Sequence, residues 1–307
     1  MIRSGTDRFR RELVGLREKE QFRSLREVNR RGRFSLLDGR EMIDLSSNDY
    51  LGLARDGDSL RRFYESAVGE SSPPSFASGA SRLLTGNHHE YTLLEDLLSE
   101  LYRGRAACVF SSGYHANLGI CPALAGRRDV FFSDRLNHAS LIDGIRLSGA
   151  EMIRYRHLDY DHLATLLAER RSSYRHCVIA TESVFSMDGD VADLDRLVAL
   201  RDRYDAMLLV DEAHAVGGFG ETGRGIGEVQ GATGEIALIV GTFGKALGSF
   251  GAYAILDDTM KDDLVNRMRP LIFTTALPPA VVGWTRQTVR AMTEMGAARR
   301  RLAELSD

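Results

Sequence analysis

Short apolar runs alternate with helix-type patterns through the middle of the chain. The apolar runs are typical of strands buried in a parallel sheet, and the segments between them repeat apolar residues at helical spacing. This alternation predicts an α/β fold with a mostly parallel, doubly wound sheet. The predicted strands are 106–110, 129–132, 152–155, 177–181, 207–210 and 236–240, and the predicted helices are 90–102, 113–124, 140–148, 162–169 and 193–204.

The N-terminal segment, residues 1–33, is polar, locally basic and prone to helix. Leu13, Leu16, Glu20 and Arg23 recur at helical spacing, which predicts an arm packed on the main body. A transit peptide is disfavoured there, because such peptides contain few acidic residues.

Turn and loop patterns divide the rest of the chain. Residues 34–40 predict a hairpin with Asp-Gly at its turn, while 44–52 and 69–86 predict loops. The last segment is a continuous helical pattern. We expect an N-terminal arm and hairpin over 1–45, a large domain over 46–283, and the start of a small C-terminal domain over 284–307.

Composition and charge are ordinary for a globular protein. The 307 residues are 43% hydrophobic and 27% charged, with a formal net charge of −3. This charge gives no reason to expect nucleic acid or an anionic membrane as partner. Cys108, Cys121 and Cys177 lack CxxC spacing, so we expect packed thiols in a reducing compartment, the cytoplasm. No apolar run approaches the roughly 18 residues of a membrane span, and no secretory signal opens the chain.

One lysine follows directly after the last predicted strand. The run 236–240 leads into Gly-Thr-Phe-Gly-Lys, which ends at Lys245. Ligands of open α/β sheets collect outside the carboxyl ends of the strands, so we predict that Lys245 lies in a functional site. Burial there favours the neutral amine, the nucleophilic form that makes Schiff bases. A phosphate loop is excluded, because Ile239 replaces its first glycine and Ala246 its hydroxyl residue.

Asp211 and His214 follow the preceding predicted strand. A helicase Walker B motif would need the phosphate loop and a basic groove, which the sequence does not support. A metal site could add His138 or Glu182, but no HExxH motif or cysteine cluster supports it, and we predict no metal. The interpretation that explains most is that the carboxylate and imidazole hold the pyridine nitrogen and ring oxygen of pyridoxal 5′-phosphate (PLP) bound to Lys245.

PLP also requires a phosphate cradle and a group that covers its ring. The run 111–114 follows a strand and opens a helix, whose N-terminal amides favour an anion, and Thr242 offers a hydroxyl near Lys245. His138 follows another strand and is a candidate to stack on the ring, although it could also be an ordinary polar residue. Residues 218–223 fit GxGxxG but do not open a helix directly after a strand, and GxSxG does not occur.

Taken together, these motifs resemble the α-oxoamine synthase family, PLP-dependent enzymes of fold type I with a mostly parallel seven-stranded sheet. Members condense an amino acid with an acyl thioester of coenzyme A or acyl carrier protein, and release carbon dioxide. Within the family the chain is most similar to the branch that joins L-alanine to a pimeloyl thioester. The matching runs are 45–52, 112–117, 137–140, 181–190, 211–214, 220–225, 242–245 and 273–279.

The resemblance implies a role for each matching residue. Lys245 would bind PLP covalently and remove the substrate's α-proton, Asp211 would hold the pyridine nitrogen, and His214 the ring oxygen. His138 would stack on the ring and contact the substrate, and Arg26 would bind the substrate. A homodimer with shared active sites is implied as well. The remaining expected cofactor contacts are Gly113, Tyr114, Ser186 and Thr242 within the subunit, and Thr274 and Thr275, which would reach the phosphate of the partner subunit.

The chain departs from the family pattern at its C-terminus. Members continue into a small domain that supplies an arginine for the substrate carboxylate, whereas this sequence stops at Asp307. We therefore expect the small domain to be largely missing, and the 307-residue form to bind cofactor but turn over poorly. A fragment and a shortened gene are both compatible with this departure.

Overall fold

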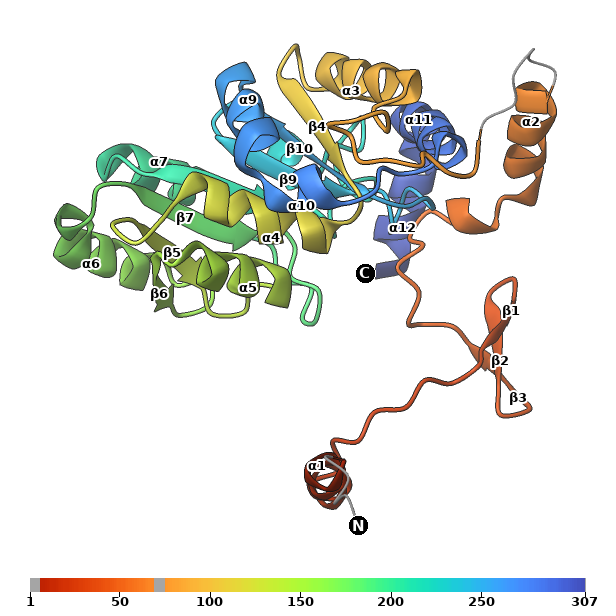
Figure 1. Cartoon of the computed structure of the whole chain (residues 1–307), viewed down its shortest axis with the longest axis horizontal. Coiled ribbons are helices and arrows are strands. Elements are labelled where there is room, and N and C mark those ends of the chain that lie inside the picture. Colours follow the sequence, from red (N-terminus) through yellow and green to blue (C-terminus); the bar gives the residue numbers. More distant parts are fainter. Residues whose placement is uncertain (1–5, 69–74, 307) are drawn as a thin grey trace. The chain divides into compact units, whose positions relative to one another are not determined.

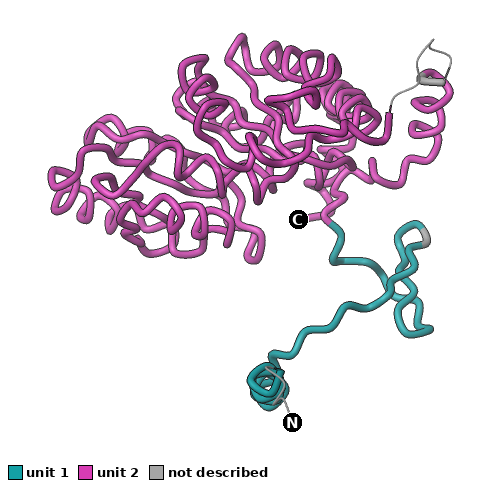
Figure 2. Tube along the Cα trace, viewed as in Figure 1, with its two compact units in different colours: residues 1–47 teal, residues 48–307 magenta. Residues whose placement is uncertain are grey.

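The computed structural model describes residues 6–68 and 75–306. They form two compact units, residues 1–47 and 48–307, drawn in different colours in Figure 2. The described part contains no helix long and apolar enough to cross a membrane.

From residue 6 onward, the first unit contains one helix and a small antiparallel sheet of order β1-β2-β3. The hairpin prediction is confirmed: Asp38 and Gly39 have φ of 50° and 75°, the left-handed pair that a two-residue hairpin turn requires. The helical segment is shorter than we expected, because the helix ends at Glu18, before Glu20 and Arg23, and is followed by an unpredicted strand. The elements are α1 (Asp7–Glu18), β1 (Asn29–Arg31), β2 (Phe34–Leu37) and β3 (Arg40–Ile43).

The second unit is built on a seven-stranded sheet of order β4-β10-β9-β8-β7-β5-β6 (Figure 1). β10 pairs antiparallel with both of its neighbours, and the other pairings are parallel. The predicted mostly parallel sheet is confirmed; the seventh strand, β10, lies just after Lys245, where no strand was predicted. The strands are β4 (Ala106–Phe110), β5 (Val130–Asp134), β6 (Glu151–Tyr155), β7 (Cys177–Glu182), β8 (Met207–Asp211), β9 (Leu238–Thr242) and β10 (Ala252–Leu256).

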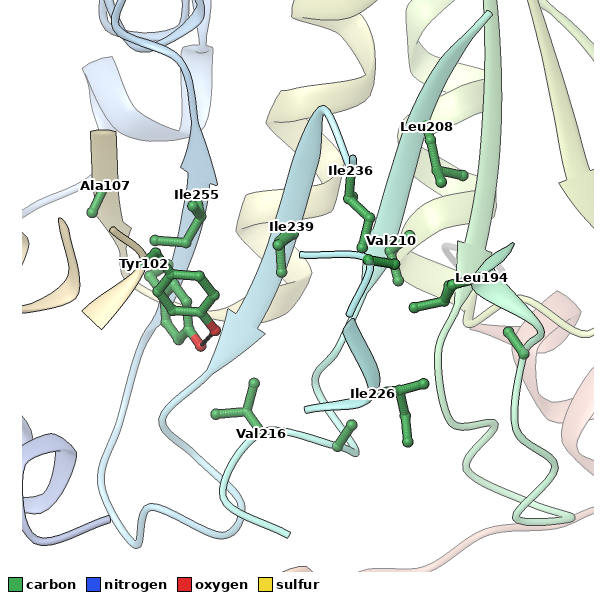
Figure 3. Packing of buried hydrophobic residues seen from close by; sticks show 14 of the residues in the cluster. Tyr102, Ala107, Leu194, Leu208, Val210, Val216, Ile226, Ile236, Ile239 and Ile255 are labelled. Carbon is green, nitrogen blue, oxygen red and sulfur yellow. Dashed lines mark hydrogen bonds between the residues drawn. The ribbon is translucent and has the colours of Figure 1, made fainter. Parts of the chain in front are cut away.

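Helices cover both faces of this sheet, and each face has its own hydrophobic cluster. Leu208 and Val210 of β8 point into the cluster shown in Figure 3, which also contains residues of α3, α6, α7 and α11. Leu209 lies on the opposite face, with residues of α4, α5 and α9. Because side chains alternate along a strand, Asp211 faces the same side as Leu209. These helices are α3 (His89–Leu101), α4 (Gly113–Leu124), α5 (Ala139–Ser148), α6 (Tyr160–Arg170), α7 (Leu194–Arg203), α9 (Asp258–Arg267) and α11 (Pro279–Glu294).

The C-terminal segment is two helices rather than the continuous helix we predicted. The first begins at Pro279, where proline is favoured in the first helical turn, and ends at Glu294. The second begins at Gly296, and its buried Arg299 donates to the carbonyl of Met292 at 2.6 Å. The remaining short or terminal elements are η1 (Leu53–Arg55), α2 (Gly57–Val68), η2 (Arg171–Ser173), α8 (Ile226–Val229), α10 (Arg269–Phe273) and α12 (Gly296–Ser306).

Candidate active site

The carboxyl ends of three neighbouring parallel strands form the floor of the candidate site. In the sheet register, Glu182 at the end of β7 pairs with Asp211 at the end of β8, and Asp211 pairs with Val240 of β9. Thr242 ends β9, and Lys245 follows three residues later. The structure therefore places Lys245 and Asp211 at the edge of the sheet where α/β proteins bind ligands.

Asp211 is buried, with 6% of its surface exposed, and two N–H groups hold its carboxylate. Asn117 Nδ2 donates to Oδ2 at 2.7 Å, and the backbone N–H of Ala213 donates to Oδ1 at 2.9 Å. Asn117 also donates to Ser140 Oγ at 3.0 Å. Asn117 lies in the matching run 112–117, but no role was predicted for it from the sequence. Its position one turn into α4, the helix that begins beside the site, could have indicated that it contacts Asp211.

Lys245 is half-buried, and its environment favours the neutral amine. Burial lowers the pKa of Lys245 below its ordinary value of 10.5, although the charges of Asp211 and Glu182 act in the opposite direction. The adjoining loop is closely packed: Gly248 has a φ of +56°, and a Cβ there would lie 2.4 Å from the backbone nitrogen of Ala54. Glycine at position 248 is thus required for this loop to fold against η1.

His214 lies one turn beyond Asp211, and its Nδ1 is 2.8 Å from the hydroxyl of Tyr50. The pKa of His214 is lowered to about 4, first by burial and then by the positive charges of Lys245 and His138. The imidazole is therefore neutral at physiological pH, and a proton donated by Tyr50 to Nδ1 would leave Nε2 as a donor. Tyr50 was missed as a site residue, although it lies in the sequence run 45–52.

His138 caps the N-terminus of α5 and is exposed at the rim of the site. Its Nδ1 lies 2.8 Å from Ser140 Oγ, and its backbone N–H donates to Glu182 Oε1 at 2.5 Å. Glu182 is buried, and its pKa is raised to about 8, first by burial and then by the charge of Asp211. The ring of Tyr114 meets His138 edge to face, with 6.3 Å between centroids, and the Tyr114 hydroxyl donates to Asp143.

The proposed phosphate cradle is brought together in part. A Cβ on Gly113, the first residue of α4, would lie 3.9 Å from Thr242 Cβ, so the helix N-terminus and this threonine are neighbours. Thr242 Oγ1 accepts from the backbone N–H of Gly244 at 3.2 Å and donates to the carbonyl of Gly251 at 3.0 Å. A helix N-terminus beside a hydroxyl favours a bound anion such as phosphate.

Other predicted residues do not join this group. Ser186 lies in an exposed turn, and Arg26 belongs to the first unit. Thr274 and Thr275 line a narrow pocket with Arg82, Ser111 and His115, and Thr275 bridges to Ser81. The structure of one chain therefore leaves these four roles as predictions.

The residues at the floor fit PLP by their chemistry. A half-buried lysine with a lowered pKa would supply the amine, and a buried carboxylate held by two N–H donors would hold the ring nitrogen. A neutral imidazole and a helix N-terminus suit the ring oxygen and the phosphate. Each of the four needs of the cofactor therefore has a candidate group, and His138 at the rim remains the predicted ring cover.

Comparisons with known proteins identify the family. A model of class I and II aminotransferases matches residues 40–307, so the chain belongs to this family. It is 50% identical over 299 residues to 8-amino-7-oxononanoate synthase of Chlorobaculum parvum, an alignment that covers 96% of this chain and 76% of that enzyme.

Solved structures give the same result. A serine palmitoyltransferase from S. paucimobilis, with a bound PLP–myriocin aldimine, has a TM-score of 0.85 and 32% identity, covering 98% of this chain and 75% of that one. An 8-amino-7-oxononanoate synthase from Francisella tularensis has a TM-score of 0.66 and 28% identity, covering 83% and 70%. The predicted α-oxoamine synthase family and fold are confirmed, and the chain is shorter than these relatives.

Proposed function

We propose that this chain catalyses the PLP-dependent, decarboxylative condensation of L-alanine with a pimeloyl thioester to 8-amino-7-oxononanoate, a step of biotin biosynthesis. The observation that carries the proposal is the 50% identity, over 96% of the chain, to an enzyme of that name. The 32% identity to serine palmitoyltransferase gives weaker support to serine and a longer acyl group as substrates. The enzyme class, a PLP-dependent acyltransferase, is common to both choices.

PLP, when bound, supplies an electron-withdrawing ring that stabilises the charge left when a bond to the amino acid's α-carbon breaks. Lys245 would hold the cofactor through its amine, whose pKa burial lowers, and Asp211 would hold the proton on the ring nitrogen. His214 would donate to the ring oxygen, with its ring oriented by Tyr50. Once released from the cofactor, the Lys245 amine can take the α-proton of the substrate.

The rim residues would complete the site. We assign Gly113, Tyr114, Ser186 and Thr242 to cofactor contacts, and His138 to the exposed ring face and the substrate. Thr274 and Thr275, which line a narrow pocket with Ser111, would serve the phosphate of a second copy of the chain. Arg26 would bind the substrate. These roles make a homodimer with shared sites part of the proposal.

The test combines cofactor binding and turnover. The purified chain is incubated with PLP, and the release of coenzyme A is then measured with L-alanine and pimeloyl-coenzyme A, and in parallel with glycine or serine and other acyl-coenzyme A esters. We expect a visible absorbance band and fastest release with alanine and the pimeloyl ester. Faster release with serine and palmitoyl-coenzyme A would overturn the substrate assignment, and PLP binding without turnover of any pair would overturn the catalytic one.

A further inference from the structure

His157 bridges two carboxylates outside the floor of the site. It follows β6, and its Nδ1 is 2.9 Å from Asp134 Oδ1, while its Nε2 is 3.1 Å from Asp190 Oδ2. Its ring also meets Phe185 edge to face, with 4.4 Å between the centroids. Carboxylate oxygens accept hydrogen bonds, so only an imidazolium, with a proton on each nitrogen, satisfies both contacts.

The two carboxylates belong to the two segments that carry rim residues. Asp134 is fully buried at the end of β5, and it also accepts the backbone N–H groups of Leu136 at 2.8 Å and Leu158 at 2.9 Å. It thereby fixes the loop 135–138, which ends at His138 and is here called the His138 loop. Asp190 lies in residues 183–192, which follow β7 and which we call the Ser186 turn.

The Ser186 turn is anchored at its base but exposed at its tip. The backbone N–H of Ser183 donates to the carbonyl of Asp211 at 3.0 Å, and Val184 bridges to Val191. Beyond this base, Met187 is 89% exposed, and the turn closes on itself through backbone hydrogen bonds only. His157 therefore supplies a side-chain link between the turn and the neighbouring strand end.

We propose that His157 is a positioning residue that, in its protonated form, couples the Ser186 turn to the His138 loop. Its effect on the cofactor rests on the proposed function, because only that function assigns Ser186 and His138 to PLP. When the imidazolium loses a proton, the buried Asp134 keeps the remaining N–H, and a lone pair then faces the carboxylate of Asp190. The link to the turn is lost while the link to β5 stays.

The direction of the pH effect follows from the groups around His157. Burial lowers its pKa, but the hydrogen bonds and charges of Asp134 and Asp190 outweigh burial and raise the pKa above the ordinary 6.5. Nearby Arg156 and Asp159 pair with each other at 2.8 Å and do not contact the ring. The stabilisation is therefore fully present below pH 6.5, and it is lost as the pH rises through the raised pKa.

Hydrogen exchange of the full chain without cofactor tests the coupling directly. The amides of Phe185 and Gly189 are hydrogen-bonded within the turn, and their protection factors are measured at about pH 5.5 and about pH 9. We expect about tenfold greater protection at the lower pH, as for one charged hydrogen bond. In His157→Gln, which has a single donor group and no titration, protection should be equal at both pH values and match the wild type at the higher one.

Two controls keep the test specific. Asp188→Asn removes an exposed charge from the same turn, and His176→Gln removes a histidine that pairs with Asp129 at 3.1 Å elsewhere. Both should keep the wild-type pH dependence. The proposal is overturned if the protection of the turn amides still depends on pH in His157→Gln, or if this pH dependence disappears in either control.

PLP affinity supplies the second measurement. We expect His157→Gln to bind PLP about fivefold more weakly than the wild type at the lower pH and equally at the higher pH, since one charged contact is lost only there. Absence of PLP binding in the wild type would reject the proposed function, whereas the exchange result would still decide the coupling. Equal affinities at the lower pH, with altered exchange, would reject the link between this turn and the cofactor.

Discussion

The floor and the rim of the candidate site are built differently. The floor consists of Asp211, Asn117 and Glu182, which are buried at strand ends or on the helix that covers them. Hydrogen bonds such as that from Asn117 Nδ2 to Asp211 Oδ2 at 2.7 Å hold these side chains. The rim includes His138 and Ser186, which are exposed on loops. Side chains fixed by burial orient a ligand before it binds, whereas exposed ones require separate support.

This difference predicts that substitutions at the floor have larger effects than those at the rim. In Asp211→Asn a neutral amide replaces the charge that would hold the proton of the ring nitrogen. We expect kcat/KM for alanine and pimeloyl-coenzyme A to fall by about 10²–10³-fold, as when a preorganised electrostatic contact is removed. Asp188→Asn, in an exposed turn, is the control, and a comparable loss there would contradict the comparison.

Asn117→Ala should have the next largest effect. It removes the N–H that holds Asp211 Oδ2 and leaves the carboxylate held only by the Ala213 N–H on Oδ1, so we expect about a tenfold lower kcat/KM with little change in cofactor stoichiometry. The matched control is Asn266→Ala, which changes an exposed asparagine of α9. Unchanged kinetics in Asn117→Ala would mean that Asp211 does not need the hydrogen bond from Asn117.

Glu182→Gln should alter the pH dependence of stability. The pKa of Glu182 is raised from 4.5 to about 8, so its protonated form stabilises the fold below pH 4.5, and this contribution is lost as the pH rises through about 8. The variant should therefore lose less stability than the wild type over that interval in urea unfolding. Glu100→Gln, at an exposed position, should follow the wild type; identical slopes for all three proteins would contradict burial of Glu182 as the cause.

Ser186→Ala should have the smallest effect. Its side chain is exposed and would offer one hydrogen bond to the cofactor, so we expect PLP affinity to fall by no more than about threefold. PLP affinity is measured by titration of the absorbance band. If Ser186→Ala lowers PLP affinity as much as Asp211→Asn does, the exposed rim contributes as much to cofactor binding as the buried floor, which would contradict the comparison.

The same division explains what the sequence could predict. The strand ends that carry Asp211 and Lys245 follow directly from the apolar runs, and these positions are as predicted. Asn117 and Tyr50 meet their partners across 94 and 164 residues of sequence, so only the tertiary structure assigns them. The structure of one chain cannot test the role expected for Thr274, because a contact with the partner subunit's phosphate requires a second copy of the chain.

The fold shows the same limit. β10 was missed because the prediction relied on parallel strands that alternate with helices, whereas Ala252–Leu256 returns antiparallel to β9 after the glycine-containing loop that follows Lys245. The break between α11 and α12 could not be predicted from the spacing of apolar residues, because the helical pattern continues through Met295 and Gly296.

The central claim is that the amine of Lys245 binds PLP, and the chain has three candidate lysines for this role: Lys19, Lys245 and Lys261. Lys19 is exposed, and Lys261 pairs with Glu95 at 3.1 Å. The most direct measurement is borohydride reduction of the PLP-loaded protein, followed by peptide mass mapping. We predict a phosphopyridoxyl group on Lys245 alone and none in Lys245→Ala. A label on Lys19 or Lys261, or an unlabelled Lys245 in a fully loaded protein, would contradict the account.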